Sequence, residues 1–104
     1  MFGWGVRAVS VDELAEKLSA GKPVVIDVRE PREFAAGHIK GSVNIPLGAL
    51  AAKTGKFDPG TDTYLICHSG NRSASAARIL QRAGFEHAYS VKGGIAAWTG
   101  RLVR

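Results

Sequence analysis

The sequence predicts an α/β fold with a small, mostly parallel, five-stranded sheet and helices on both of its faces. Two continuous apolar runs, PVVIDV at 23–28 and TYLIC at 63–67, are typical of strands buried on both faces. Helical patterns alternate with these runs and with shorter apolar segments, as expected of parallel strands joined by crossover helices. A length of 104 residues suits one domain, which we expect to span 1–104.

The first half of the chain contains clear signals for helix ends. Ser10 and Glu13 have the spacing of a capping box, so a helix is expected from there to Gly21. A shorter helix is expected after Pro31, a residue favoured in the first helical turn, and should end at Gly37. The remaining elements expected here are strands at 7–10, 23–28 and 41–47 and a weak helix at 47–53.

The second half begins with the buried strand 63–67 and continues with the most convincing helix of the chain, 73–84. This helix is rich in alanine, carries Arg78 and Arg82 near its end, and meets Gly84 as its stop. A last strand at 87–91 and a short closing helix at 93–100 complete the pattern. In sheets of this kind, sites form beyond the carboxyl ends of strands, and Cys67 occupies such a position.

Composition narrows the classes of function. The net charge is +5, and the whole excess lies in residues 52–104, which favours an anionic substrate or an acidic partner unless the surface is merely basic. Nucleic acid is not expected, because the basic residues are scattered and no aromatic residue is interleaved with them. No apolar run approaches the roughly 20 residues that span a bilayer, and the pattern of the opening residues leads us to expect no secretory signal. We therefore expect a cytoplasmic monomer that does not enter membranes.

The only cysteine, Cys67, is followed by a loop that has the features of an anion site. The first N–H groups of a helix lack internal partners, and Gly70 allows several of them to point inward. Arg72 adds a cation, and Ser73 is a candidate cap for the helix. A lone cysteine at a strand end is more often inert core, but this loop favours a reactive thiol with a lowered pKa.

A single thiol also restricts the chemistry. With one cysteine the chain can form no internal disulfide and no multi-cysteine zinc site, and no His/Asp/Glu cluster has metal-ligand spacing. A group taken up by Cys67 must therefore be discharged to an external acceptor. This favours group transfer over a self-contained dithiol oxidoreductase.

Three stretches of the chain form a recognisable set: VVIDVREPREFAAGHIKGSVNIPL at 24–47, the loop CHSGNRS at 67–73, and VKGGIAAWTG at 91–100. Together they resemble the rhodanese family of sulfurtransferases. Lys40 and Ser42 depart from the residues that are usual in the first of these segments. The resemblance runs from about Val9 to Gly100 and is to a stand-alone domain, not to the tandem form.

The resemblance implies sulfur transfer through a persulfide on Cys67, with no other cofactor. Sulfur would come from thiosulfate or a persulfide donor and would pass to cyanide, a thiol or a partner protein. The loop N–H groups would hold the anion, and the residues implied in substrate binding are His68, Ser69, Gly70, Asn71, Arg72 and Ser73. Arg72 is expected to steer the anion and His68 to face incoming partners.

Two other functions stay open. The same loop would serve a persulfide carrier or partner-binding module that does not turn over alone. A cysteine-based phosphatase or arsenate reductase is more distant, because such phosphatases place five residues between the cysteine and the arginine. Here four lie between Cys67 and Arg72.

Several other residues are candidates for supporting roles. Asp27 and Arg29 end a strand near the expected site, and we interpret them as structural, pairing with each other or with backbone. His38 is likewise expected to make a structural hydrogen bond. Trp98 is expected in the core or in a pocket wall, whereas Phe2 and Trp4 are either loose apolar residues or a docking patch.

Overall fold

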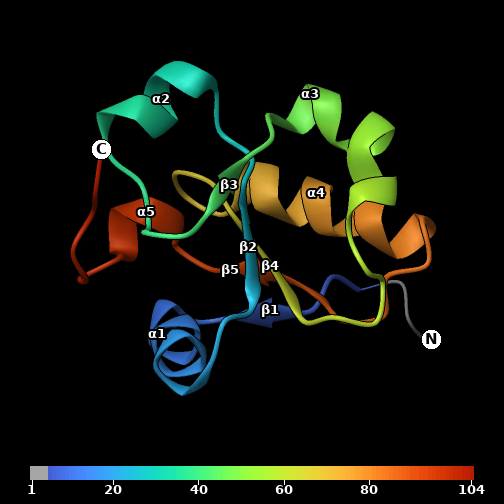
Figure 1. Ribbon diagram of the computed structural model, residues 1–104, viewed down its shortest axis with the longest axis horizontal. Coiled ribbons are helices and arrows are strands. Elements are labelled where there is room, and N and C mark those ends of the chain that lie inside the picture. Colours follow the sequence, from blue (N-terminus) through green and yellow to red (C-terminus); the bar gives the residue numbers. More distant parts are fainter. Residues whose placement is uncertain (1–4) are drawn as a thin grey trace.

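A computed structural model describes residues 5–104, so Phe2 and Trp4 lie outside the described part. Five strands form one sheet in the order β1-β5-β4-β2-β3, and all four ladders between neighbours are parallel (Figure 1). The strands are β1 (Ala8–Val9), β2 (Val24–Asp27), β3 (Val43–Asn44), β4 (Thr63–Ile66) and β5 (Ala88–Val91). The predicted five-stranded α/β fold is therefore confirmed.

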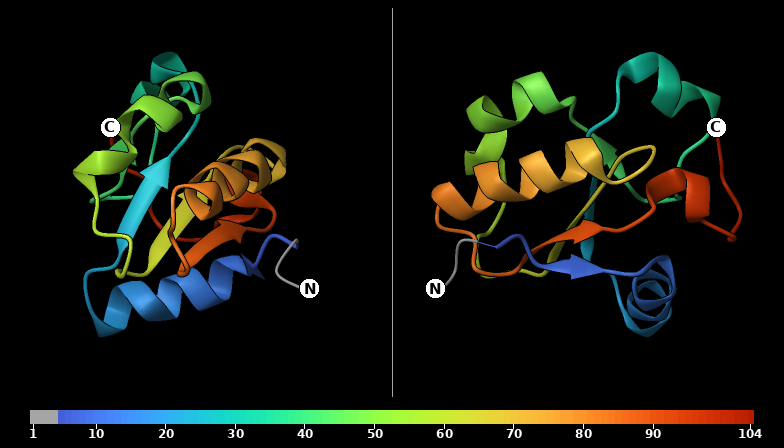
Figure 2. Two further views of the ribbon diagram at one scale, coloured as in Figure 1. Left: turned by 90° about the vertical axis from the view of Figure 1, so that its right-hand side faces the viewer. Right: turned by 180° about the vertical axis from the view of Figure 1, so that it is seen from behind.

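Helices cover both faces of this sheet. They are α1 (Val11–Ala20), α2 (Pro31–Ala36), α3 (Leu47–Leu50), the 3-10 helix η1 (Ala51–Lys56), α4 (Asn71–Arg82) and α5 (Gly94–Ala97). Figure 2 shows the strands between α1 on one side and the layer of α3 and α4 on the other. Two apolar clusters fill the two interfaces, one beneath α3 and α4 and one beneath α1.

Strand β4 lies in the middle of the sheet and is buried along its whole length. It pairs with β2 on one side and β5 on the other, so its carboxyl end is enclosed by neighbouring elements. Because all strands are parallel, their carboxyl ends share one edge of the sheet, where sites of α/β proteins form. The residue that follows β4 at this edge is Cys67.

The helix signals of the first half act as predicted. The Ser10 hydroxyl accepts a hydrogen bond from the Glu13 N–H at 3.0 Å, and the Glu13 carboxylate accepts one from the Ser10 N–H at 3.2 Å. This reciprocal pair satisfies two N–H groups that a helix start leaves without partners. Pro31 occupies the first position of α2, where its missing N–H costs nothing.

Several elements are shorter than the sequence pattern predicts, among them β1, β3, α3 and α5. The strand expected at 41–47 is reduced to β3, because Ser42 folds back onto the Ile39 carbonyl and Pro46 has no N–H to donate. The helix expected at 47–53 is α-helical only as far as Leu50 and continues as η1.

The carboxyl-terminal segment returns to the region of α2 (Figure 1). His38 and Val103 form an antiparallel bridge, with N–O distances of 2.9 and 2.8 Å in the two directions. Across residues 5–104, no helix combines the length and the apolar character needed to cross a membrane.

Candidate active site

Cys67 is buried, with 1% of its surface exposed, at the point where β4 turns into α4. The turn is short because Gly70, in the left-handed region at a φ of 108°, is itself the N-cap of α4. Ser73 was predicted as this cap, and that prediction was wrong. Glycine adopts a positive φ without steric cost, so the helix begins earlier and Ser73 lies inside its first turn.

Two backbone N–H groups point at the sulfur of Cys67. Gly70 donates to Sγ at 3.0 Å, and Ser73 donates at 3.3 Å. Burial raises the pKa of the Cys67 thiol, but hydrogen bonds from the Ser73 N–H and hydroxyl and from the N–H groups of Gly70 and Ser69 outweigh it. The net pKa is lower than that of an ordinary thiol, so the site favours a thiolate.

Other N–H groups of the loop remain available to a ligand. Within residues 5–104, the N–H groups of His68, Asn71 and Arg72 have no hydrogen-bond acceptor. Asn71 and Arg72 open α4, so the partial positive charge of the helix N-terminus adds to theirs. Together with Gly70 and Ser73, these groups form a cradle suited to an anion close to Cys67.

The amino end of α5 holds this loop from outside. Ile95 donates its N–H to the Cys67 carbonyl, and Ala96 donates to the His68 carbonyl, both at 2.9 Å. Gly94 makes this approach possible. A Cβ atom at Gly94 would lie 2.7 Å from the His68 carbonyl carbon and even closer to the Cys67 carbonyl oxygen, and its φ is +55°. Only glycine fits both the conformation and the space.

A buried pair of hydroxyl groups supports the loop from the sheet. The Ser73 and Ser90 Oγ atoms lie 2.8 Å apart, and the Ser73 Oγ lies 3.0 Å from the Gly70 carbonyl, so its single proton can turn to that carbonyl or to the thiolate of Cys67. Ser73 is fully buried and Ser90 is 4% exposed. Because buried hydroxyl groups need partners, this chain of contacts fixes the first turn of α4 against β5.

Arg72 is the cation expected to steer an anionic substrate. Its guanidinium forms a two-pronged ion pair with Glu33 of α2, and both side chains are about one-third exposed. This pairing, helped by the Glu30 N–H, lowers the pKa of Glu33 from its ordinary 4.5 to about 2. The same pair raises the pKa of Arg72. The charge of Arg72 is therefore compensated, and its action on an anion stays a prediction.

Asp27 and Arg29 form a buried ion pair next to the site, with Nη2 and Oδ2 2.8 Å apart. Arg29 also donates to the Gly37 carbonyl at 2.7 Å, which ties the end of α2 to the end of β2. Asn44 donates to the carbonyls of Asp27 and Arg29, both at 3.0 Å. The pair that the sequence suggested is thus present and holds neighbouring segments together.

His38 makes a local contact of the kind expected. Its Nδ1 lies 2.8 Å from the Phe34 carbonyl, and its ring stacks on the Phe34 ring with centroids 3.7 Å apart. His68, in contrast, is exposed at the rim of the loop. No group of three or more His, Cys, Asp or Glu side chains in residues 5–104 could hold a metal ion.

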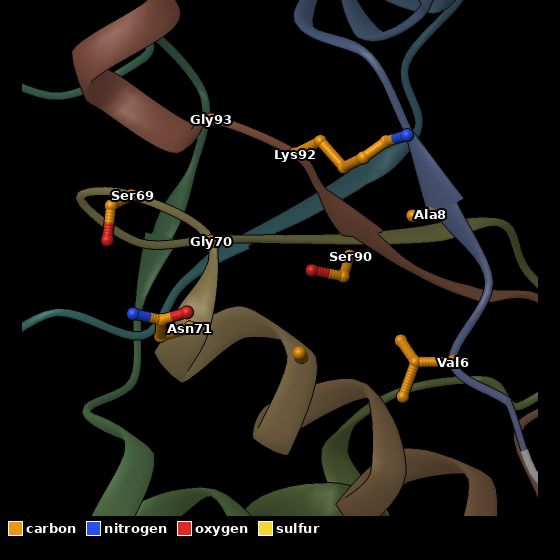
Figure 3. Close-up of a pocket in the computed structure, with 9 residues that line it drawn as sticks. Val6, Ala8, Ser69, Gly70, Asn71, Ser90, Lys92 and Gly93 are labelled. Atoms are coloured by element: carbon orange, nitrogen blue, oxygen red, sulfur yellow. The ribbon is translucent and has the colours of Figure 1, made fainter.

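A hollow of about 410 Å³ adjoins the loop on the side of β1 and β5. Figure 3 shows Ser90 pointing from the strand toward Gly70, and Lys92 extending across to the strand that carries Ala8. The side chains of Ser69 and Asn71 point away from Ser90 in this view. The hollow therefore exposes the outer side of the loop more than Cys67 itself.

Three residues that shape the site were not predicted individually from the sequence: Glu33, Ser90 and Gly94. Glu33 and Ser90 each contact the first turn of α4 from distant parts of the chain, 39 and 17 residues away. No local pattern marks such contacts. Gly94 lies in a Gly-Gly pair that was visible as part of a motif, and the positive φ of both glycines is the physical reason for that pair.

A family model described as the rhodanese-like domain matches residues 10–101. The chain belongs to the rhodanese-like family. That family includes sulfurtransferases, and the described loop lies inside the matched range. The likeness seen in the sequence is thereby confirmed at the level of the family and of the fold.

Rhodanese-like relatives of this chain include proteins with different names. YrkF of Bacillus subtilis, a candidate sulfur carrier protein, is 35% identical over 97 residues, covering 92% of this chain and 52% of that protein. The chain thus spans about half the length of that relative. The thiosulfate sulfurtransferase GlpE of Pseudomonas entomophila is 38% identical over 86 residues, covering 83% of this chain and 79% of that protein.

The rhodanese-like fold is also evident from solved structures. The crystal structure of a rhodanese-related protein from Thermoplasma volcanium has a TM-score of 0.85 at 34% identity. The match covers 93% of this chain and 97% of the other.

Proposed function

We propose that this protein is a sulfurtransferase that moves a sulfane sulfur from thiosulfate or a persulfide donor to a thiophilic acceptor. The observation that carries the proposal is the position of Cys67 Sγ, held by the N–H groups of Gly70 and Ser73 beside three further N–H groups, those of His68, Asn71 and Arg72, without acceptors in the described chain. A thiolate beside an anion cradle is equipped to attack an anionic sulfur compound.

In the first half-reaction, the Cys67 thiolate attacks the outer sulfur of thiosulfate. A bond forms between Sγ and that sulfur, while the bond to the sulfonyl sulfur breaks and its electron pair leaves with sulfite. The new terminal sulfur lies about 2 Å beyond Sγ and carries the negative charge. In that position, the N–H groups of His68, Asn71 and Arg72 become its donors.

In the second half-reaction, a nucleophilic acceptor attacks the terminal sulfur. Cyanide or a thiolate forms the new bond, and the electron pair of the old S–S bond returns to Sγ. Because the N–H groups of Gly70 and Ser73 stabilise that returning thiolate, Cys67 is a good leaving group. No resident cofactor is needed, since the persulfide itself carries the sulfur.

A second candidate function is a persulfide carrier that delivers sulfur to one partner protein and turns over slowly with small molecules. Cys67 is only 1% exposed, and this burial favours a carrier because a buried sulfur is shielded from small-molecule acceptors in solution. The likeness to YrkF supports this alternative and the likeness to GlpE supports the enzyme. The two differ in the rate of the second half-reaction, not in the first.

The test is thiosulfate:cyanide sulfur transfer by the purified protein, with Cys67→Ala alongside and intact mass measured after thiosulfate alone. We expect one added sulfur on the wild type, thiocyanate formation, and neither in the variant. Sulfur loading without turnover would select the carrier. Turnover retained in Cys67→Ala would overturn both the sulfurtransferase and the carrier. Hydrolysis of an aryl phosphate by the wild type would instead support a cysteine-based phosphatase.

A further inference from the structure

A second hollow, of about 540 Å³, lies on the face of the sheet that is opposite α4. It is enclosed by the carboxyl end of α1, the 39–41 loop and the segment after α5. Its apolar floor consists of Leu18, Val25, Ile39 and Trp98, all members of or packed against the core cluster beneath α1. The volume is in the range of small-molecule sites, roughly 300–1,000 Å³.

Three cations surround this floor: Lys22, Lys40 and Arg101. All three are exposed, and within residues 5–104 none of them forms an ion pair. Among the described residues lining the hollow, none has an acidic side chain. Three positive charges from distant parts of the sequence thus border one hollow whose described lining has no acidic side chain.

The indole of Trp98 forms part of the apolar floor, and its N–H is not exposed to the hollow. Its Nε1 is buried and has no hydrogen-bond partner within the described chain. Gly100 covers it, since a Cβ atom there would lie 2.7 Å from Nε1. Buried donors without partners are rare in folded proteins. Lys22, Lys40 and Arg101 can only donate hydrogen bonds, so the complementary ligand is one whose head group only accepts.

We propose that this hollow is a binding site for a small amphipathic organic anion. An aliphatic or aromatic chain covers the apolar floor, and a carboxylate or sulfonate head group lies at the mouth among Lys22, Lys40 and Arg101. The head group stays partly hydrated there, so the three cations attract it without the cost of full burial.

This site is separate from the one that carries the proposed function. None of the residues of the Cys67 cradle lines the hollow. A loss of sulfur transfer and a loss of anion binding are therefore distinguishable outcomes, measured at different places.

The probe is octanoate, with octanol and octylammonium as neutral and cationic analogues of equal length. Binding is followed by the NMR signal of the Trp98 indole N–H, made unambiguous by working in a Trp4→Phe background. We expect octanoate to shift this signal saturably, to bind more weakly at high salt, and to bind at least fivefold more tightly than octanol or octylammonium.

Charge-removing variants complete the experiment. We expect Lys22→Gln, Lys40→Gln and Arg101→Gln each to weaken octanoate binding by about two- to fivefold, as for exposed ion pairs, and the triple variant by about tenfold or more. Lys53→Gln is the matched control, because Lys53 is equally exposed but lies on η1, next to the other face. It should leave the affinity unchanged.

Three results would overturn the proposal. One is equal affinity for octanoate and octanol, which would show that the cations play no part. Another is full affinity in the triple variant. The third is loss of octanoate binding in Cys67→Ala or competition by thiosulfate, which would place the anion at the Cys67 loop.

Discussion

Arg72 and Glu33 join α4 to α2 through two parallel contacts, Nη1–Oε1 at 2.7 Å and Nη2–Oε2 at 2.9 Å. The pair lies beside the loop of Cys67 and neutralises the cation that the sequence assigns to substrate. An incoming dianion therefore meets backbone N–H groups as the principal uncompensated positive charge of the loop. The strength of this ion pair should control how strongly Arg72 attracts an anionic substrate.

Replacing Glu33 by glutamine should release Arg72. We expect a two- to threefold lower KM for thiosulfate in the transfer assay, because the freed guanidinium can approach the anion. Glu16→Gln is the control, since Glu16 is exposed on α1 and forms no ion pair with Arg72. An unchanged KM in Glu33→Gln would show that the charge of Arg72 does not reach the cradle.

The low pKa of Glu33, about 2 against an ordinary 4.5, predicts a pH dependence of stability. Because the folded pKa lies below the unfolded one, this contribution is complete above pH 4.5 and is lost as the pH falls toward 2. Solvent screening limits it to about 1 kcal/mol or less. Urea unfolding between pH 2 and 6 should show the free energies of wild type and Glu33→Gln converging at the acidic end.

The lowered pKa of Cys67 should be visible in its reactivity. Alkylation by iodoacetamide, followed against pH, should have its midpoint below that of a free thiol. Ser73→Ala removes a hydroxyl group that stabilises the thiolate, so the midpoint should move to higher pH. Ser69→Ala keeps its backbone N–H and should leave the midpoint in place. Equal midpoints in the wild type, Ser73→Ala and Ser69→Ala would show that the Ser73 hydroxyl does not stabilise the thiolate.

Gly94→Ala should damage fold and site together. The new Cβ would collide with the carbonyl groups of Cys67 and His68 at a φ of +55°, at a cost of about 2–5 kcal/mol. Urea unfolding would measure this loss, and sulfur loading at low temperature would measure the distortion of the loop. Gly48→Ala, which has open space around its Cβ position in α3, should instead stabilise the protein by up to about 1 kcal/mol.

Asp27→Ala should be among the most destabilising single changes. It leaves Arg29, 5% exposed, without its carboxylate, and removing one partner of a buried pair costs about 3–5 kcal/mol. The exposed Glu16 of α1 gives the control, because Glu16→Ala should change the free energy of unfolding by no more than about 0.5 kcal/mol. Similar values for both variants would mean that the pair contributes little.

Much of the fold could be predicted because its strongest signals are local. The runs 23–28 and 63–67 identify the two central buried strands, and the capping box of Ser10 and Glu13 defines the start of α1. The edge strand β3 was overestimated, since its limits depend on Ser42 folding back on Ile39. Such a contact has no period that a sequence pattern could reveal.

The candidate site likewise has a part that could be predicted from local sequence and a part that could not. The loop around Cys67 is contiguous in sequence, so its chemistry could be inferred from residue types alone. The start of α4 could not be inferred in this way. Gly70 adopts a left-handed conformation and caps the helix, although Ser73 is the residue type that usually caps helices. Contacts between Arg72 and Glu33, or between Ser73 and Ser90, depend on which distant segments the sheet brings together.

The contact of α5 with the loop has a consequence for the protein during its synthesis. Cys67 precedes Ala97, the last residue of α5, by 30 residues, and β1 must wait for β5 before it can pair. At roughly 5–20 residues per second, a ribosome adds this stretch in about 2–6 s. Until then the carbonyls of Cys67 and His68 lack the N–H groups of Ile95 and Ala96. In the nascent chain, the donors that lower the pKa of Cys67 are therefore made several seconds before the α5 contacts that hold their loop in place.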